Sequence, residues 1–198
     1  MKSLFCSIAL LLGSLSGLAT AQINIPQSGQ FFPQFLETFE INPGATTQFP
    51  GLPPLGTSSP NTAIFTGLPV GGILIKSQNV QMLPPLRGQT CLFGRGTDVT
   101  IQFFDPMRRF GGFFSRTNVA GAPTAVQFDF WLGGVQFGSS GPIALPPTAG
   151  PGTSAYVGLF FDLGPFGGYD RVDIRGIGGV FPAHLGFVGM DDVMASQI

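Results

Sequence analysis

The chain of 198 residues is poor in the side chains from which most active sites and metal centres are built. It contains one histidine, two cysteines and one tryptophan, and only 10% of its residues are charged. A Ser-His-Asp triad would have to use His184, which lies in FPAHLG, and the sequence has no G-x-S-x-G motif for the nucleophile. Zinc is disfavoured as well, because His184 and Cys91, the one histidine and the one cysteine outside the first 21 residues, do not fill a site without several carboxylates.

An excess of positive charge is also missing. Lysine and arginine together number 9 against 10 aspartates and glutamates, which gives a net charge of −1. No basic stripe is present, so we do not expect a nucleic-acid partner. Cys6 lies in the leader segment described next, which leaves Cys91 without an internal disulfide partner, and we expect its thiol to be buried.

The first residues, MKSLFCSIALLLGSLSGLATAQ, combine Lys2 with a short apolar run and a small-x-small sequence that ends at Ala21. This pattern is typical of a secretory signal peptide that is cleaved after Ala21. The apolar run is too short to cross a membrane as a helix, so we expect no transmembrane segment in the mature chain. We expect a secreted, periplasmic or cell-surface protein with a signal peptide at 1–21, a linker at 22–33, one domain at 34–194 and a short tail at 195–198.

Glycine, proline and phenylalanine are abundant instead, with 30, 18 and 21 residues. Glycine and proline disfavour helices, and no segment shows a sustained helical period of apolar residues. Short alternating segments recur between turn residues, as in TAVQFDFWL. We expect strands at 34–41, 62–67, 71–77, 79–83, 98–104, 108–116, 124–132, 135–140, 155–162, 169–176 and 185–193. Asp105, Pro106 and Met107 are expected to form a turn. The pattern predicts an all-β fold, a two-sheet antiparallel β-sandwich of jelly-roll type.

Four blocks in this order point to a known group of domains. They are ETFE (37–40), DVTIQFFDPMRRFGGFF (98–114), FDFWLGGVQFGS (128–139) with YVGLFFDLGPFGGYDRVDIRG (156–176), and GFVGMDDV (186–193). Together they resemble the β-sandwich domain of exported bacterial proteins of the PEP-CTERM type. The resemblance implies a jelly-roll-like domain that acts at or outside the cell surface. The sequence ends at MASQI without a Pro-Glu-Pro sorting signal, so the anchoring that accompanies such domains is not implied.

Aromatic side chains provide the first candidate site. Trp131 shares the polar face of its expected strand with Gln127 and Asp129. An exposed ring flanked by amide and carboxylate groups holds sugar rings by stacking and hydrogen bonds. The alternative is that both faces of this strand are covered, which would make Trp131 a core residue. Tyr156 and Tyr169 are candidates of the same kind.

Acidic residues of the first and last expected strands provide the second candidate site. Calcium takes six to eight oxygen ligands, many of them main-chain carbonyls, so a loop-rich sandwich can hold it with two or three carboxylates. Glu37 or Glu40 with Asp191 or Asp192 are the candidate ligands for a structural calcium ion. Alternatively, these are ordinary acids at strand ends, because the sequence has no D-x-D-x-D loop. On a regular strand Asp191 and Asp192 point to opposite faces.

A further group of charges, Arg171, Asp173 and Arg175, shares one face of the expected strand 169–176. Cross-strand ion pairs on a solvated sheet explain these residues without a function.

The leading hypothesis is a non-enzymatic exported module that binds a carbohydrate or a surface polymer, with calcium as a candidate stabilising ion. One alternative is a secreted polysaccharide hydrolase that uses two carboxylates. Another is a structural component of the extracellular matrix, assembled through its Pro-rich loop and its phenylalanine-rich surface.

Overall fold

A computed structural model describes residues 23–39, 47–49, 51–52, 63–68, 74–77, 91–94, 98–116, 122–146, 155–179 and 188–198. Several predictions lie outside these residues, namely the signal peptide, the strand at 79–83, Glu40 and His184. No helix among the described residues is long and apolar enough to cross a membrane.

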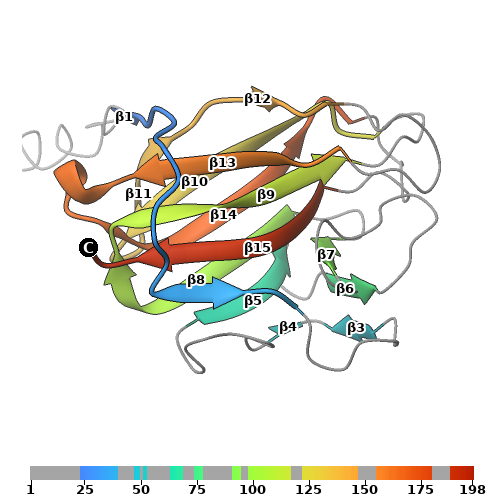
Figure 1. The fold of residues 1–198 in the computed structure, drawn as a ribbon, viewed down its shortest axis with the longest axis horizontal. Coiled ribbons are helices and arrows are strands. Elements are labelled where there is room, and N and C mark those ends of the chain that lie inside the picture. The colour runs from blue at the N-terminus through green and yellow to red at the C-terminus, as the bar shows by residue number, and fades with distance from the viewer. Residues whose placement is uncertain are drawn as a thin grey trace, which may run out of the picture.

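The described strands form two sheets, as the all-β pattern of the sequence predicts (Figure 1). The eight-stranded sheet contains β1 (Ile23–Asn24), β4 (Gly51–Leu52), β5 (Ala63–Leu68), β8 (Asp98–Met107), β10 (Ala125–Leu132), β11 (Val135–Ser139), β12 (Ile143–Ala144) and β14 (Tyr169–Ile177). The seven-stranded sheet contains β2 (Phe35–Glu37), β3 (Thr47–Phe49), β6 (Leu74–Ser77), β7 (Cys91–Gly94), β9 (Arg109–Arg116), β13 (Val157–Asp162) and β15 (Val188–Ser196). One 3₁₀ turn, η1 (Gly164–Phe166), follows β13.

The order in the first sheet is β1-β11-β10-β14-β8-β5-β4, with β12 also paired to β10. In the second sheet the order is β13-β9-β15-β7-β6-β3, with β2 also paired to β15. Every pairing is antiparallel except that of β1 with β11. The two-sheet antiparallel architecture is therefore confirmed, whereas the jelly-roll topology remains a prediction.

Phenylalanine rings from both sheets fill the space between them. Phe128 of β10 contacts Phe114 of β9 and Phe161 of β13, with ring centroids 4.9 and 5.0 Å apart. Most of the ring pairs in this core meet edge to face, the arrangement that aromatic quadrupoles favour. The abundance of phenylalanine in the sequence is thus explained by the core of the sandwich.

Three strand pairings contain a register shift, one of them between Phe130 and Trp131 where β10 pairs with β11. In β8 and β14 the register shifts between Tyr169 and Arg171, so that four residues of β8 lie opposite one of β14. Pro106 falls in this interruption, where a missing main-chain donor is tolerated, so the expected turn at 105–107 is instead part of β8. In β15 the pairing to β9 shifts between Asp191 and Met194. Such bulges re-aim the side chains beside them.

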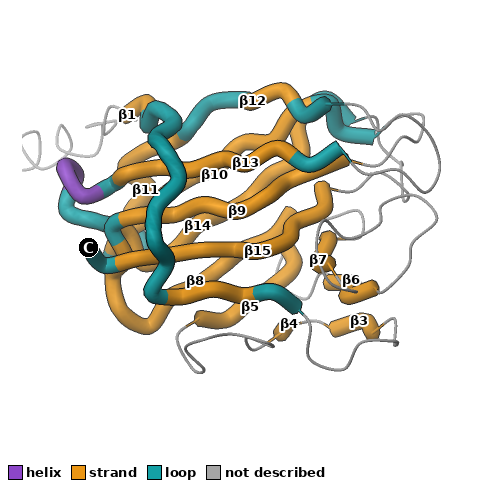
Figure 2. The backbone as a smooth tube through the Cα atoms, in the orientation of Figure 1, coloured by secondary structure: helices purple, strands orange, loops and turns teal. Residues whose placement is uncertain are grey.

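The N-terminal segment lies against the sandwich. From β1 it runs across the outer face of the seven-stranded sheet, in front of β13, β9 and β15 (Figure 2), to reach β2, the blue strand in Figure 1. Ile25 is buried in the core between the sheets. The segment expected to be a linker is therefore packed onto the domain, because its apolar residues find partners there.

Candidate functional site

The candidate site lies on the outer face of the eight-stranded sheet. Along β10, Val126, Phe128 and Phe130 are fully buried in the core. The intervening residues Gln127, Asp129 and Trp131 therefore belong to the opposite face, as the alternation predicted.

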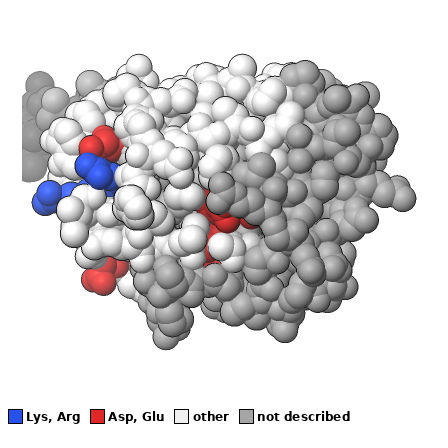
Figure 3. Space-filling view, in the orientation of Figure 1, with Lys and Arg blue, Asp and Glu red and all other residues white. Residues whose placement is uncertain are grey.

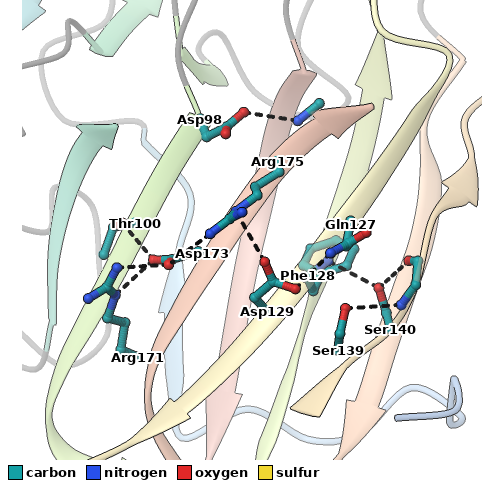
Figure 4. Close-up of polar contacts among 12 residues, drawn as sticks. Asp98, Thr100, Gln127, Phe128, Asp129, Ser139, Ser140, Arg171, Asp173 and Arg175 are labelled. Carbon is teal, nitrogen blue, oxygen red and sulfur yellow. Dashed lines mark hydrogen bonds and ion pairs between the residues drawn. The ribbon is translucent and has the colours of Figure 1, made fainter. Parts of the chain in front are cut away.

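Strand β14 places a second row of polar side chains beside the first. Asp129 lies directly opposite Asp173, and Trp131 lies directly opposite Arg171. Two carboxylates at opposing positions of a ladder repel each other unless positive charges neutralise them. Arg171 and Arg175, which flank Asp173 on β14, supply those charges (Figure 4).

Asp173 is the centre of the resulting network. Arg171 donates to it through two nitrogens, Nε to Oδ1 and Nη2 to Oδ2, each at 2.8 Å. Thr100 of β8 donates its hydroxyl to Asp173 Oδ1 at 2.7 Å. The two arginine side chains are 31% and 40% exposed, whereas the Asp173 side chain is 1% exposed. A bidentate arginine–carboxylate contact of this kind fixes geometry as well as charge.

Asp129 is held from two sides. Gln127 Nε2 donates to Asp129 Oδ1 at 2.8 Å. Arg175 Nε lies 3.1 Å from Asp129 Oδ2 as an ion pair, and its N–H direction does not make this contact a hydrogen bond. Gln127, Asp129, Arg171, Asp173 and Arg175 are called the Asp–Arg network below.

Trp131 lies at one end of the Asp–Arg network and is half-buried. The guanidinium carbon of Arg171 is 4.6 Å from the centre of its ring, which is cation–π distance. The indole N–H has no hydrogen-bond partner within the described part of the chain. Trp131 therefore offers a ring that Arg171 holds in place, while its indole N–H is shielded from solvent.

The two tyrosines are not part of this surface. Tyr169 is fully buried, and its hydroxyl donates to the main-chain carbonyl of Arg109 at 3.1 Å. Burial raises the pKa of the Tyr169 phenol well above its ordinary value, so the group stays neutral. The prediction of Tyr169 as a binding residue is wrong, because the register shift after it turns the ring inward. Tyr156 precedes β13 in the other sheet, so the structure does not bring it to Trp131.

The acidic residues of the first and last strands lie in the other sheet. Glu37, Asp191 and Asp192 are all buried. Glu37 pairs with the core residue Val193. Asp191 instead pairs with Phe113, which packs on the outer side of this sheet. Because directly paired residues share a face, Glu37 points to the core side and Asp191 to the outer side.

Main-chain strain accompanies these acids. Among the described residues, the non-glycine positions with positive φ are Phe39 (58°) and Asp192 (46°). In each case the strained residue donates its N–H to a neighbouring carboxylate, Phe39 to Glu37 Oε1 at 2.6 Å and Asp192 to Asp191 Oδ1 at 2.9 Å. The described residues contain no group of three His, Cys, Asp or Glu side chains arranged to hold a metal ion. Figure 3, which looks onto the outer face of the seven-stranded sheet, shows a small acidic area near its centre.

Sequence reasoning identified Gln127, Asp129 and Trp131 but treated Arg171, Asp173 and Arg175 as ordinary surface charges. These residues complete the site, since Arg175 neutralises Asp129, Arg171 holds the Trp131 ring, and Asp173 fixes both arginines. The available signal was the alternation of charges in DRVDIR, which matches the alternation in QFDFW. That match indicates a shared site only when β10 and β14 are known to be paired.

Asp98, at the start of β8, adds a titratable group beside the Asp–Arg network. Its Oδ1 accepts the N–H of Gly176 at 3.1 Å. Burial raises the pKa of Asp98 above its ordinary value, although the Gly176 hydrogen bond and the Arg175 charge oppose this. A raised folded-state pKa means that the folded protein binds this proton more tightly than the unfolded chain. The stabilisation is then present at low pH and is lost as the pH rises through the raised pKa.

We therefore expect Asp98→Asn to leave the protein as stable as the wild type or slightly more stable at neutral pH. The gain is less than about 1 kcal/mol, because water screens a partly exposed carboxyl group. Urea unfolding at a series of pH values measures it, and the difference from the wild type should shrink toward acid pH. Asp105→Asn, which removes an exposed carboxylate of the same strand, controls for the loss of one charge. Destabilisation of Asp98→Asn at neutral pH would contradict this assignment.

Comparisons with known proteins support the architecture. No protein-family model matches the sequence, and no curated protein matches it at a significant level. Among solved structures, the chain is similar to the K2 cleaved adhesin domain of Lys-gingipain, with a TM-score of 0.51 and 14% identity over 82% of this chain and 97% of that chain. It also matches the enzymatically active domain of tailspike protein 4 of bacteriophage CBA120, with a TM-score of 0.36 and 18% identity over 69% of this chain and 19% of that chain. The first likeness shows the fold alone, and the second is too loose to support an argument.

Proposed function

We propose that this protein is an exported β-sandwich module that binds a carbohydrate or a surface polymer through the outer face of its eight-stranded sheet. The observation that carries the proposal is Trp131, a half-buried ring on that face beside five polar side chains held in fixed positions. A ring with a preorganised polar surround loses little entropy when a sugar stacks on it. The partly exposed guanidinium groups of Arg171 and Arg175 supply donors for hydroxyl groups.

The geometry favours binding over hydrolysis. Asp129 and Asp173 form a carboxylate pair, but both are buried and each is held by an arginine. A glycosidase needs one carboxyl group as a proton donor and a second one that can reach the sugar. The rigid and covered pair fits a scaffold for Trp131 better than a catalytic pair.

We expect Trp131→Ala to weaken binding at least about tenfold, the equivalent of 1.4 kcal/mol, because stacking on the ring is lost. A printed array of neutral and acidic glycans identifies the probe, and titration with the strongest hit gives the affinities. Trp131→Phe keeps a flat ring and should retain part of the affinity. Phe32→Ala removes an exposed aromatic side chain that lies away from this surface and should bind as the wild type does. Equal affinities of Trp131→Ala and wild type would overturn the proposal.

We also propose that the protein is exported and belongs with the β-sandwich domains of PEP-CTERM-type proteins. The shared motifs support this by their places in the fold. ETFE begins in β2, and the two aspartates of GFVGMDDV lie in β15, directly before the residues that pair with β2. Sequencing of the N terminus of the exported protein, expected at Gln22, tests cleavage after Ala21.

Calcium stabilisation is the last part of the proposal. What supports it is the burial of Asp191 and Asp192 in β15 and of Glu37 in the paired strand β2, with main-chain strain at Phe39 and Asp192. Because Glu37 and Asp191 point to opposite faces of the sheet, one ion would be held by only one of these two. Strained main-chain conformations of this kind cluster at ligand-binding sites, where contacts with the surrounding structure maintain them. Since no three side chains form a ready metal site among the described residues, main-chain carbonyls would have to provide further ligands.

Thermal unfolding with excess calcium and with a chelator tests this part separately. At a calcium concentration about 100-fold above the dissociation constant, the stability gain is about 2.7 kcal/mol, or roughly 5–11 °C in Tm for a domain of this size. Asp192→Asn should abolish the difference between the two conditions. Asp105→Asn, at an exposed acid, should preserve it. Identical midpoints of the wild type in calcium and in chelator would remove calcium from the proposal.

A further inference from the structure

Residues 23–34, called the N-terminal arm, cover the edge strands of both sheets on one side of the sandwich. In the eight-stranded sheet, β1 pairs with β11, and Ile25 N donates to Ser139 O at 2.8 Å. In the seven-stranded sheet, Gln27 forms a bridge to Phe161 of β13, and Ser28 N donates to Phe160 O at 2.7 Å. Uncovered strand edges are templates for pairing with another chain. The N-terminal arm therefore closes two edges that would otherwise be open.

One side chain of the N-terminal arm enters the core. Ile25 is 1% exposed and belongs to the main core cluster. Its side chain lies against Gly138 of β11, where an added Cβ would be 2.8 Å from Ile25 Cγ1 and 2.9 Å from Cδ1. A side chain at position 138 and the side chain of Ile25 therefore exclude each other. Gly138 forms the floor of a socket that fits one aliphatic residue.

The rest of the N-terminal arm is attached at few points. Phe31 packs with Phe160 and Met194 in a small cluster apart from the main core. The residues between Ile25 and Phe31 are mostly exposed, and Phe32 is 97% exposed. Two apolar anchors joined by main-chain hydrogen bonds are the way in which proteins bind an extended peptide at a sheet edge. The N-terminal arm is thus bound to its own domain as a peptide ligand would be.

We propose that the same socket and strand edges accept the N-terminal arm of a second copy of this chain, so that two molecules assemble by arm exchange. The exchanged arm makes every contact that it makes in the closed monomer, so the two forms differ little in contact energy. Phe32 and Pro33 connect the docked residues to β2, and proline keeps this connection extended. If the main chain changes direction at Phe32 and Pro33, the N-terminal arm points toward a second molecule while β2 stays in place.

A second copy is the partner that this surface fits. It presents an isoleucine and a phenylalanine six residues apart on an extended segment, which matches the Gly138 socket and the cluster around Phe160. The arrangement leaves no edge uncovered on this side of either sheet, because each released edge is filled by the partner's arm. Protein concentration then decides between closed monomer and exchanged dimer.

The test uses two complementary variants, each produced by export so that its N terminus is natural. Ile25→Arg carries an arm that does not enter the socket, while its socket is intact. Gly138→Val carries an intact arm, while its own socket is filled. Each variant alone should be a monomer with a lowered Tm, and their equal mixture should form a heterodimer of twice the mass by light scattering, with a Tm above that of either variant.

Ile23→Arg is the matched control for Ile25→Arg, because it places the same charge on a partly exposed position of the N-terminal arm. Mixed with Gly138→Val, it should stay monomeric, since its socket is already occupied by its own Ile25. If the severe variants do not fold, Ile25→Ala with Gly138→Ala makes the same comparison, as a single Cβ at 138 already meets Ile25. Mixtures of both pairs that remain monomers across the micromolar range would overturn the proposal.

Discussion

Replacement of Phe128 by alanine is expected to lower the free energy of unfolding by about 3–5 kcal/mol. Phe128 comes from the eight-stranded sheet, and its ring contacts Phe110 and Phe114 of β9 and Phe161 of β13. The ring therefore holds the two sheets together at their centre. Its removal loses the burial of a large apolar side chain and leaves a cavity that rigid strands on both sides do not fill.

Urea unfolding measures this loss, and thermal unfolding should show a fall in Tm of roughly 6–20 °C. Phe104→Ala is the matched control, since it removes the same side chain from the same sheet at a position that is 57% exposed. It should change the stability by no more than about 0.5 kcal/mol. If both variants lost the same amount, the rings between the sheets would not be what stabilises the sandwich.

The core of β10 is the part of the fold that a single sequence reveals most directly. In TAVQFDFWL the period of two separates the core-facing residues Val126, Phe128 and Phe130 from those on the other face, and the structure confirms this division, although Asp129 is itself buried there. The pattern is local, because a strand exposes its two faces alternately whatever its neighbours are. All-β composition and most strand positions follow from the same signal.

The position at which the prediction failed, Tyr169, lies next to a bulge. By alternation Tyr169 should share the outward face of Arg171 and Asp173, yet it is buried, because the register between β14 and β8 shifts at this point. Asp192 also lies within a register shift, with a positive φ. A bulge depends on how two distant strands fit together, so the residues of one strand do not reveal it.

The candidate site depends on pairing across the sequence for the same reason. Asp129 and Asp173 belong to strands that are far apart in the chain, and nothing near either residue indicates that they will face each other. The N-terminal arm is a similar case, since Ile25 reaches the core only because Gly138 leaves room for it. Local patterns thus predicted which residues point outward, while the contacts among them required the sheet register.

Replacement of Gly168 by alanine is the second change with a large expected effect. Gly167 and Gly168 connect η1 to β14 and have nearly the same φ, +90° and +93°. An L residue with such a φ is strained by about 1–2 kcal/mol. At Gly168 an added Cβ would also lie 2.6 Å from the carbonyl oxygen of Met107, whereas at Gly167 it would meet nothing within 4 Å.

The close approach to the Met107 carbonyl is more damaging than the unfavourable φ, because a main-chain atom of a neighbouring strand would have to move. Met107 is paired with Tyr169 at the start of β14, so its carbonyl does not move aside without shifting β8. The alternative is to move Tyr169, whose ring packs against Phe103, Phe110 and Phe130 in the core. Overpacking of this kind adds about 1–3 kcal/mol to the strain. We therefore expect Gly168→Ala to lose about 3 kcal/mol or more and Gly167→Ala about 1–2 kcal/mol.

Denaturant unfolding of the two variants, in parallel with the wild type, separates the two effects. Their φ values match, so the difference between them isolates the close approach of position 168 to β8. An equal loss at both positions would mean that the turn moves away from Met107 at no further cost. In that case the start of β14 would be adaptable, and the inward placement of Tyr169 would depend on the packing of its ring rather than on the path of the turn.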